Sequence, residues 1–321
     1  MTKKIILDLD TGIDDTLALS YILGSPDAEL IGITGTYGNV LLETGVNNDL
    51  NLLAMFGRED IPVFKGPSHP SDASDFSVPP SSGIFHGENG TGNIEIPAKS
   101  TKQAQEQSAV DFIIESARKY DQDELVYVPT GASTTLDAVY AKAPDVIDRL
   151  KVVMMGGALT QPGNCNPFME ANISQDPQAS NRVFATEANI TMIGLDVTMK
   201  VLMTKEDTQQ LRELGTKAGR FLADMTDYYI DISEQEDPAF QGGCNLHDPL
   251  AAAVALDATL VQTFPVNLMV ETEGPGIGRT IGDPNRLLSP VKNTKVAIDV
   301  DGDRFVKRFK ERLFALAAQS E

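Results

Sequence analysis

The sequence predicts an α/β fold in which a mostly parallel central sheet is flanked by helices, as in a Rossmann-like open sheet. Short apolar runs alternate with longer amphipathic runs along the 321 residues, and the short runs are apolar almost throughout. Strands of this kind are buried on both faces, as in a parallel sheet covered by helices. No internal repeat and no low-complexity linker divides the chain, so we expect a single domain over residues 1–321.

The strands are predicted from short runs that are rich in Val, Ile, Leu and Met. IILDL lies near the start of the chain, and ELIGITGT, ELVYVP, KVVMM and ITMIGL follow at intervals that leave room for helices. The predicted strands are residues 5–9, 29–36, 124–129, 151–155 and 190–195. The last part of the chain, KVAIDVDGDRFVKRFKERLFAL, predicts one more strand and a closing amphipathic helix.

Helices are predicted where apolar residues recur at helical spacing. They cover residues 14–23, 41–56, 104–120, 134–143, 177–185 and, within a more acidic stretch, 205–236. Two long segments lack this periodicity, at residues 67–100 and 157–175, and we expect active-site loops there. We also expect a mobile helical segment at residues 222–243.

The composition limits the partners and the compartment. The net charge of −20 argues against nucleic acid and anionic membranes, which attract Lys and Arg. Cys165 and Cys244 are far apart and form no CxxC pair, so neither a disulfide framework nor a cysteine-based zinc site is expected. Since no signal peptide and no uncharged apolar stretch of about 18 residues is visible, we expect a cytoplasmic protein without a membrane span.

Four aspartates, Asp8, Asp10, Asp14 and Asp15, lie within eight residues directly after the apolar run at residues 5–7. They follow the first predicted strand, and ligands of open α/β sheets bind beyond the carboxyl ends of the strands. A single aspartate there can cap the next helix, but four cannot all be caps. Their mutual repulsion would raise their pKa values unless a cation lies among them. Ligands that are all oxygen favour a hard cation, Ca²⁺ or Mg²⁺.

Two known motifs with closely spaced aspartates fit less well. An EF-hand loop counted from Asp8 would need Gly in place of Ile13 and Glu in place of Leu19. A phosphatase of the haloacid dehalogenase type has Asp-x-Asp-Gly-Thr after a strand, whereas Thr11 precedes Gly12 here. The phosphatase stays an alternative, with Asp8 as its nucleophile, but it leaves the other polar motifs of the chain without a role.

Further polar residues follow other predicted strands or open other helices. HDP at residues 247–249 precedes an apolar helix, where Asp248 can be a carboxylate ligand or simply the helix N-cap. The loop after MMGGA carries Asn164, Glu170 and Asn172, which suit a hydroxyl-rich ligand such as a sugar or form Asx turns. A backbone carbonyl at the end of the VPTG strand could complete a calcium shell.

Together these motifs resemble the nucleoside hydrolase family, the inosine/uridine-preferring ribohydrolases, over the whole chain. DLDTGIDDTLAL is similar to the family's N-terminal D-x-D-x-G-x-D-D motif, and TYGN, HGENG, VPTG, MGGA, EANI, HDPLA and EGPGIGRT follow in the family's order. The resemblance implies the nucleoside hydrolase fold and a homodimer or homotetramer. It also implies hydrolysis of the N-glycosidic bond of ribonucleosides to ribose and free base, through attack of a Ca²⁺-bound water at the anomeric carbon.

The resemblance implies roles for particular residues as well. Ca²⁺ would be held by Asp10, Asp15, Asp248 and the carbonyl of Thr130. Asp10 would be the general base, and His247 would protonate the leaving base. The residues expected to contact the nucleoside are Asp14, Asn39, His86, Met155, Asn164, Glu170, Asn172 and Asp248.

Some positions depart from the family pattern. Ala171 replaces an aromatic residue that the family often has, ASTT replaces a P-L-T-N loop, and residues 226–243 lack Arg, although Tyr228 or Tyr229 could contact the base. The base preference therefore stays open. A metal-dependent nucleoside- or ribose-binding protein without turnover is a second alternative, although binding alone would need neither a general base nor a general acid.

Overall fold

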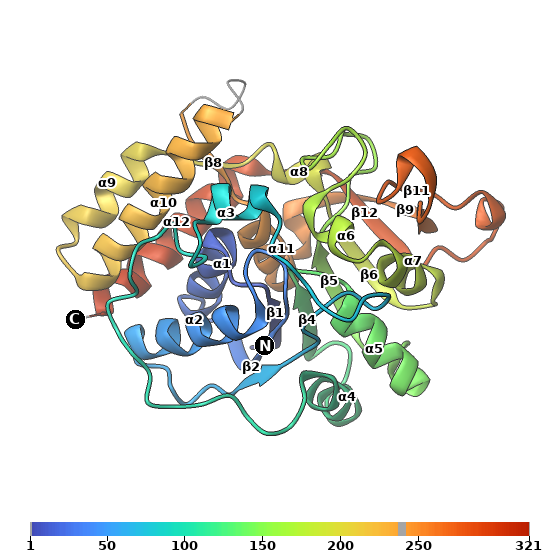
Figure 1. Ribbon diagram of the computed structural model, residues 1–321, viewed down its shortest axis with the longest axis horizontal. Helices are drawn as coiled ribbons and strands as arrows, with labels where there is room; N and C mark the ends of the chain where they lie inside the picture. Colours follow the sequence, from blue (N-terminus) through green and yellow to red (C-terminus); the bar gives the residue numbers. More distant parts are fainter. Residues whose placement is uncertain (1, 237–241, 321) are drawn as a thin grey trace.

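The computed structural model describes residues 2–236 and 242–320. Across these residues the main sheet has eight strands in the order β3-β2-β1-β4-β5-β6-β12-β9. Neighbouring strands are parallel except at one edge, where β9 runs antiparallel to β12. The arrangement confirms the predicted open α/β sheet with helices on its faces (Figure 1).

The strands of the main sheet are β1 (Lys3–Leu9), β2 (Ala28–Gly35), β3 (Val63–Lys65), β4 (Leu125–Pro129), β5 (Lys151–Met155), β6 (Asn189–Ile193), β9 (Val261–Val266) and β12 (Thr294–Val300). Two small antiparallel pairs are β7 (Leu202–Met203) with β8 (Cys244–Asn245) and β10 (Leu268–Val270) with β11 (Thr280–Gly282). The α-helices are α1 (Ile13–Leu23), α2 (Leu42–Met55), α3 (Pro80–His86), α4 (Ala109–Lys119), α5 (Thr134–Lys142), α6 (Ala171–Gln175), α7 (Pro177–Ala185), α8 (Leu195–Thr198), α9 (Lys205–Glu213), α10 (Lys217–Glu236), α11 (His247–Leu256) and α12 (Gly302–Gln319). None of the described helices is both long and apolar enough to cross a membrane.

The alternation of side chains along the central strands divides the core into two layers. On β1, Ile5, Leu7 and Leu9 pack in one cluster with side chains of α1, α2, α11 and α12. Ile6 faces the opposite cluster, which contains side chains of α4, α5 and α7. Both faces of β1 are therefore buried, and this explains the apolar run of residues 5–7 in its sequence.

Two predicted boundaries differ from the structure for local reasons. The predicted helix 104–120 begins only at Ala109, because the Ser108 hydroxyl caps it by accepting from the Asp111 N–H at 3.1 Å. The predicted helical stretch 205–236 is interrupted at Gly215, whose φ of +73° lies in the left-handed region. It therefore forms two helices, α9 and α10.

The two long predicted loops contain short helices. Residues 67–100 include α3, which has Pro80 in its first turn, and residues 157–175 end in α6. The predicted strand 190–195 ends at Ile193, since Gly194 already caps α8. The segment 222–243 is helical up to Glu236, its residues 237–241 lie outside the described residues, and its mobility stays a prediction.

Candidate active site

The candidate site lies at the carboxyl ends of β1 and β4, where the strand order of the sheet changes direction. The chain leaves β1 for β2 on one side, whereas β4 lies on the other side of β1. Such a switch point opens a crevice in which α/β proteins bind ligands. Asp10 follows β1 and Thr130 follows β4. The N–H of Thr130 donates to the carbonyl of Asp8 at 2.9 Å, so the two strand ends lie side by side.

Asp10 is held by the loop that follows β2. Its carboxylate accepts from the Asn39 N–H at 2.7 Å and from Asn39 Nδ2 at 3.1 Å, and only 1% of the residue is exposed. A Cβ on Gly38 would lie 1.9 Å from Asp10 Oδ2, so the close approach of this loop requires glycine. Asn39 Nδ2 also lies 3.3 Å from Asp15 Oδ2. Asn39, a predicted ribose ligand, therefore orients two acidic side chains.

Three buried carboxylates meet at the N-termini of two helices. Asp14 and Asp15 lie in the first turn of α1 and Asp248 in the first turn of α11, and one oxygen of each lies within 4.8 Å of the others. Asp15 accepts from the Thr130 hydroxyl at 2.7 Å and from the Gly12 N–H at 2.8 Å. The buried Oδ1 atoms of Asp14 and Asp248 accept no hydrogen bond from the described residues.

The possibility that these aspartates are simply N-caps is wrong. Gly12 is the N-cap of α1 and Leu246 is the N-cap of α11, so Asp14 and Asp248 both lie inside their helices. The N-terminal ends of both helices favour negative charge. This gives the carboxylates some stabilisation, but no hydrogen-bond partner for the two Oδ1 atoms.

Burial raises the pKa of every carboxyl group in this cluster. The pKa of Asp14 and that of Asp15 rise to about 6, and the pKa values of Asp10 and Asp248 rise well above the usual value. The charges of neighbouring aspartates raise the pKa of Asp10, Asp15 and Asp248 further. A cation among them would offset this repulsion and bind the unpartnered oxygens. The residues therefore fit a metal ion, and their oxygen atoms suit a hard one.

The structure brings together most of the predicted metal ligands and adds one residue. Asp15 and Asp248 lie in the carboxylate cluster, Thr130 contacts Asp15, and Asp10 is linked to Asp15 through the Asn39 amide. Asp14, which the resemblance assigns to ribose, lies in the cluster itself. It is therefore a candidate metal ligand as well.

His86, at the end of α3, reaches the N-terminus of α1. Its Nδ1 accepts from the Ile13 N–H at 3.1 Å and lies 3.9 Å from Asp14 Oδ1. Burial lowers the pKa of His86 to about 4, so the ring is neutral near pH 7. A Cβ on Gly12 would lie 2.6 Å from this Nδ1. The predicted nucleoside contact of His86 is untested, but the ring clearly supports the turn that carries the aspartates.

His86→Asn is expected to retain most of the activity, whereas His86→Ala is expected to lower kcat/KM about tenfold. The Oδ1 of Asn can take the place of Nδ1 and accept from the Ile13 N–H, but Ala leaves this buried N–H without a partner, at a cost of about 1–3 kcal/mol. Steady-state kinetics and thermal unfolding of both variants check this. Equal losses would show that another edge of the imidazole matters more than the bond to Ile13.

His247 opens α11 and lies close to His86. Its Nδ1 is 2.8 Å from the Thr198 hydroxyl, and burial lowers the pKa of His247 to about 4. The ring of Tyr229 lies 5.6 Å from that of His86, centroid to centroid. Tyr228 instead donates its hydroxyl to the carbonyl of Ile84 at 2.9 Å. Of the two tyrosines considered for base contact, Tyr229 is therefore the one beside His86.

Glu170 and Asn172 form a second polar group at the start of α6. The Glu170 carboxylate accepts from the N–H groups of Gly157, Asn172 and Ile173 at 2.8, 3.0 and 3.1 Å. Burial raises the pKa of Glu170. Asn172 Nδ2 lies 3.3 Å from the carbonyl oxygen of Met155 and 3.2 Å from its sulfur. Three of the predicted ribose contacts, Met155, Glu170 and Asn172, therefore lie together between the end of β5 and the start of α6.

Asn164 differs from the other predicted ribose contacts. It is exposed, and its Oδ1 accepts from the Ala171 N–H at 2.9 Å. This bond holds the part of the loop that carries Asn164 against the first residue of α6. Its contact with ribose stays a prediction.

One supporting residue, Asp49, is absent from the sequence-based predictions. It is completely buried on α2, and its carboxylate accepts from the Thr11 hydroxyl at 2.7 Å, within the turn that carries Asp10. The signal was present in the sequence, because Asp49 occurs at helical spacing between the apolar residues Val46 and Leu53. A carboxylate on the apolar face of a helix requires a polar partner.

Comparison with known proteins assigns the family. A family model described as inosine-uridine preferring nucleoside hydrolase matches residues 5–307. The chain belongs to this family. The family is confirmed as predicted, and with it the enzyme class: a ribonucleoside hydrolase, which cleaves N-glycosyl bonds.

Individual nucleoside hydrolases are similar over nearly the full chain. The inosine-uridine preferring nucleoside hydrolase of Leishmania major is 34% identical over 95% of both chains, and probable uridine nucleosidase 2 of Arabidopsis thaliana is 34% identical over 97% of both. The solved structure of a purine-preferring ribonucleoside hydrolase from Gardnerella vaginalis is 56% identical, with a TM-score of 0.96 over 98% of this chain and 99% of that chain. This similarity confirms the nucleoside hydrolase fold.

Proposed function

We propose that this nucleoside hydrolase depends on Ca²⁺ and prefers purine ribonucleosides. The metal is supported by the buried cluster of Asp14, Asp15 and Asp248, in which two carboxylate oxygens have no partner among the described residues. The purine preference is supported by the 56% identity to the purine-preferring hydrolase of Gardnerella vaginalis. The relatives named for inosine-uridine or uridine are 34% identical.

The metal would be held by Asp15 and Asp248, by Asp10 or Asp14 or both, and by the carbonyl of Thr130. When bound, a divalent cation supplies a positive field that lowers the pKa of a nearby water molecule and attracts sugar hydroxyls. The same field would keep the surrounding carboxyl groups ionised, although burial raises their pKa values. The acidic cluster is therefore usable at neutral pH in the loaded enzyme.

Asp10 would act as the general base. It accepts a proton from the attacking water, whose oxygen forms a bond to the anomeric carbon as the bond to the nucleobase breaks. The two hydrogen bonds from Asn39 at 2.7 and 3.1 Å fix the direction of the Asp10 carboxylate. A single displacement by water inverts the anomeric carbon.

The walls of the crevice would stabilise the positive charge that grows on the sugar in the transition state. Asp14 is buried beside the general base Asp10, and Glu170 is held as a carboxylate by its three N–H donors. Fixed negative groups stabilise an oxocarbenium-like sugar more than they stabilise the neutral nucleoside. Asn39, Asn164, Asn172 and Met155 would complete the ribose pocket.

His247 would protonate the leaving base. When the Thr198 hydroxyl donates to Nδ1, the neutral ring carries its proton on Nε2 and can donate it toward the crevice. The low pKa of the ring makes the charged form of His247 scarce at pH 7 in the free enzyme. The proton would therefore be transferred as the negative charge on the departing base develops.

His247→Ala is expected to lower kcat for inosine by about 100- to 1,000-fold, because the base then departs without a proton donor. Hydrolysis of 4-nitrophenyl riboside should change far less, since nitrophenolate is a stable anion. The ratio of the two rates for wild type and variant is the measurement. An equal loss with both substrates would show that His247 is not the general acid and instead positions the nucleoside.

The two alternatives from the sequence have less support. A phosphatase would use Asp8 as its nucleophile, but Asp8 is completely buried and its carboxylate accepts from the Thr34 hydroxyl at 2.6 Å. Membership of the nucleoside hydrolase family disfavours both the phosphatase and a binding protein without turnover.

The proposal is tested by incubating the protein with inosine, adenosine, guanosine, uridine and cytidine, with 4-nitrophenyl phosphate as a control. Free ribose and free base are followed with and without a chelator. We expect metal-dependent ribose release that is fastest with the purine nucleosides. Faster cleavage of uridine or cytidine would contradict the base preference, and chelator-resistant activity would contradict the metal.

A further inference from the structure

A polar groove lies at the edge of the main sheet opposite the candidate active site. It has a volume of about 220 Å³, and its walls come from the turn before β4, the starts of β5, β6 and β12, the strand β9 and the end of α11. Because β4, β5, β6 and β12 are parallel, their starts lie at the edge away from the carboxyl ends that form the crevice. Its polar walls include Gln122, Lys151, Asn189, Thr191, Thr263 and Lys295.

The register of the sheet places four of these side chains on one face. Lys151 on β5 pairs with Asn189 on β6, and Lys295 on β12 pairs with Thr191 on β6. Asn189 and Thr191 are two residues apart on one strand, so their side chains point to the same face, and the side chains of the paired lysines do too. Two ammonium groups, an amide and a hydroxyl therefore share one surface of the groove.

The helix α11 covers this face of the sheet except at the strand starts. Val153, Ile193 and Ala297, each two residues beyond a residue of the groove on β5, β6 and β12, pack in the core layer that contains side chains of α11. The helix ends beside the groove, where Val254 and Ala258 form an apolar wall. The lysines thus occupy the positions at which the apolar face of the sheet is no longer covered.

A third lysine adjoins the groove at the end of α11. Lys3 Nζ donates to the carbonyl of Ala255 at 3.0 Å, in the last turn of the helix. The carbonyl end of a helix carries partial negative charge, which this ammonium group offsets. Burial and, after it, the charges of Lys3 and Lys295 lower the pKa of Lys151. The three ammonium groups are therefore close enough to repel each other.

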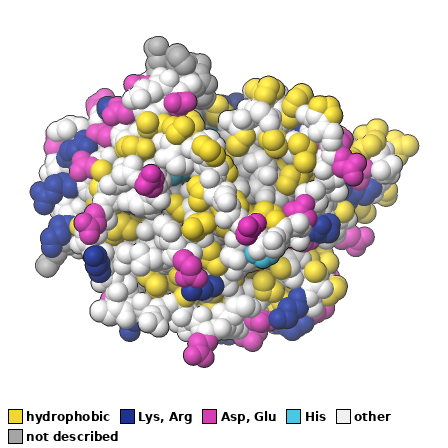
Figure 2. All heavy atoms as spheres, in the orientation of Figure 1, with side chains coloured by type: hydrophobic (Ala, Val, Ile, Leu, Met, Phe, Trp, Pro, Cys, Tyr) yellow, Lys and Arg dark blue, Asp and Glu magenta, His cyan; other side chains and the backbone are white. Residues whose placement is uncertain are grey.

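Within the described parts of the chain, no carboxylate forms an ion pair with Lys3, Lys151 or Lys295. Asp123, the acidic residue among those that line the groove, is exposed. On the face that Figure 2 displays, Lys and Arg side chains lie mostly next to Asp and Glu side chains, as expected for a chain with 46 acidic residues. The groove therefore has a positive charge that the protein does not neutralise, although its net charge is −20.

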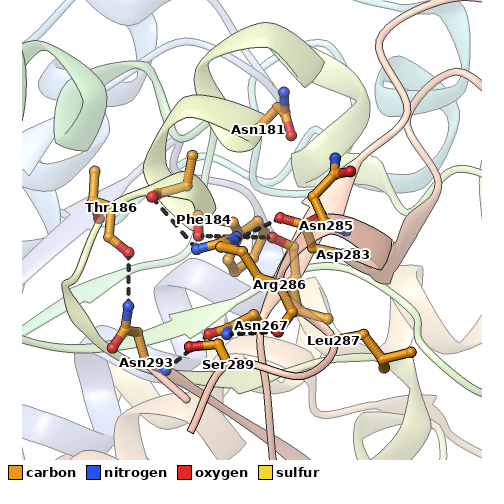
Figure 3. Close-up of polar contacts among 12 residues, drawn as sticks. Asn181, Phe184, Thr186, Asn267, Asp283, Asn285, Arg286, Leu287, Ser289 and Asn293 are labelled. Atoms are coloured by element: carbon orange, nitrogen blue, oxygen red, sulfur yellow. Dashed lines mark hydrogen bonds and ion pairs between the residues drawn. The ribbon is translucent and has the colours of Figure 1, made fainter. Parts of the chain in front are cut away.

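The strand starts that line the groove are held by a network of backbone and amide hydrogen bonds (Figure 3). The carbonyl of Asn293, just before β12, accepts from the Ile190 N–H on β6 at 3.3 Å. Asn293 Nδ2 donates to the carbonyl of Thr186 at 3.2 Å, and the Asn293 N–H donates to Asn267 Oδ1 at 3.1 Å. The groove is thus already ordered, and a ligand would pay little conformational entropy to bind there.

The chemistry of the groove suits a phosphate group. Lysine ammonium groups bind phosphate as point charges, and amide and hydroxyl groups can donate to its oxygen atoms. A phosphate monoester carries a charge of about −1.5 to −2 at pH 7, which matches several lysines better than a single carboxylate does. The groove is smaller than the about 300–1,000 Å³ of sites for drug-sized ligands, so the ligand is small.

We propose that this groove binds a phosphate group, either of inorganic phosphate or of a small phosphate monoester. Lys151 and Lys295 provide the charge, and Asn189 and Thr191 donate hydrogen bonds to the phosphate oxygens. The groove is separate from the catalytic crevice, although α11 connects the two, because Asp248 lies in its first turn and its last turn adjoins the groove. This inference goes beyond the proposed hydrolysis and does not depend on it, since its test measures binding and not activity.

The test is a calorimetric titration of the Ca²⁺-loaded protein, freed of unbound Ca²⁺, with inorganic phosphate and separately with glycerol 3-phosphate. We expect saturable binding of one phosphate group with a dissociation constant below about 1 mM. Lys151→Met and Lys295→Met should each weaken binding about tenfold or more, because each removes a charge-assisted hydrogen bond. Lys307→Met, the same change at an exposed lysine of α12 outside the groove, should bind as the wild type does.

Thermal unfolding separates a loss of binding from a loss of structure. Without phosphate, Lys151→Met is expected to unfold at the same temperature as the wild type or higher, because it removes one of three like charges. Phosphate should raise the melting temperature of the wild type and of Lys307→Met, but that of Lys151→Met far less.

The comparison of the two ligands identifies the source of the phosphate group. Equal or tighter binding of inorganic phosphate assigns the groove to the free ion, and tighter binding of glycerol 3-phosphate assigns it to a monoester. A titration of the wild type without saturable binding of either ligand would overturn the proposal. Binding that folded Lys151→Met and Lys295→Met both retain in full would also overturn it, and would place the phosphate elsewhere, for example on the bound Ca²⁺.

Discussion

Asp10→Asn is expected to lower kcat for ribose release at least about 1,000-fold. The amide cannot accept the proton of the attacking water, and it is a poorer ligand for a divalent cation than a carboxylate. The fold should persist, because the amide oxygen can still accept one of the two Asn39 hydrogen bonds. The measurement is the rate of ribose release by wild type and variant at saturating inosine.

The control for this variant is Asp257→Asn, an aspartate that caps the C-terminal end of α11, at the opposite end of that helix from Asp248. Asp257 accepts from Arg308 at 2.8 Å between α11 and α12, so its replacement tests the effect on stability alone of losing a partly buried, paired charge. Asp257→Asn should keep normal kcat even if its melting temperature falls. If Asp10→Asn keeps more than a tenth of the activity, Asp10 is not the general base.

Ca²⁺ should stabilise the protein strongly, and its removal should abolish ribose release. A cation bound only by the folded state adds about 4 kcal/mol to the free energy of unfolding when its concentration is about 1,000 times the dissociation constant. The reason lies in the cluster of Asp14, Asp15 and Asp248, where burial and repulsion disfavour the charged forms without a cation. Thermal unfolding with a chelator and with added Ca²⁺ or Mg²⁺ measures the gain.

Asp248→Asn provides the test of where the cation binds. This variant removes one charge and one ligand, so the stabilisation by Ca²⁺ should shrink by at least half while the metal-free protein becomes more stable. Asp257→Asn should show the full Ca²⁺ effect. A melting temperature that does not respond to Ca²⁺ in the wild type would contradict a metal in this cluster, whatever the activity.

Most of the sheet was predictable because the sequence of each central strand differs from that of its neighbouring helices. The apolar runs that form β1, β4 and β5 have few polar residues and lie between helical patterns. Helix ends were less predictable, since they depend on single side chains and dihedral angles. The hydroxyl of Ser108 delays the start of α4, and the positive φ of Gly215 divides α9 from α10.

The candidate site was predictable in composition but only partly in geometry. Asp15 and Asp248 were expected together, and they meet although 233 positions separate them in the chain. The run of aspartates placed Asp14 near a cation, whereas the resemblance assigned it to ribose, and only the structure shows that it shares one cluster with Asp15 and Asp248. The bond from Ile13 to His86 also needed the structure, since no pattern in the sequence connects α1 to α3.

By itself, the sequence determined the order of most central strands and of the longer helices, the acidic turn after β1 and the family to which the chain belongs. These properties depend on local periodicity and on short motifs, which a linear sequence carries in full. Only the tertiary structure decided which carboxylates share a cluster and that Asn39 and His86 orient the turn that carries them. Those properties depend on distances between residues far apart in the chain, and distances are set by packing of the whole fold.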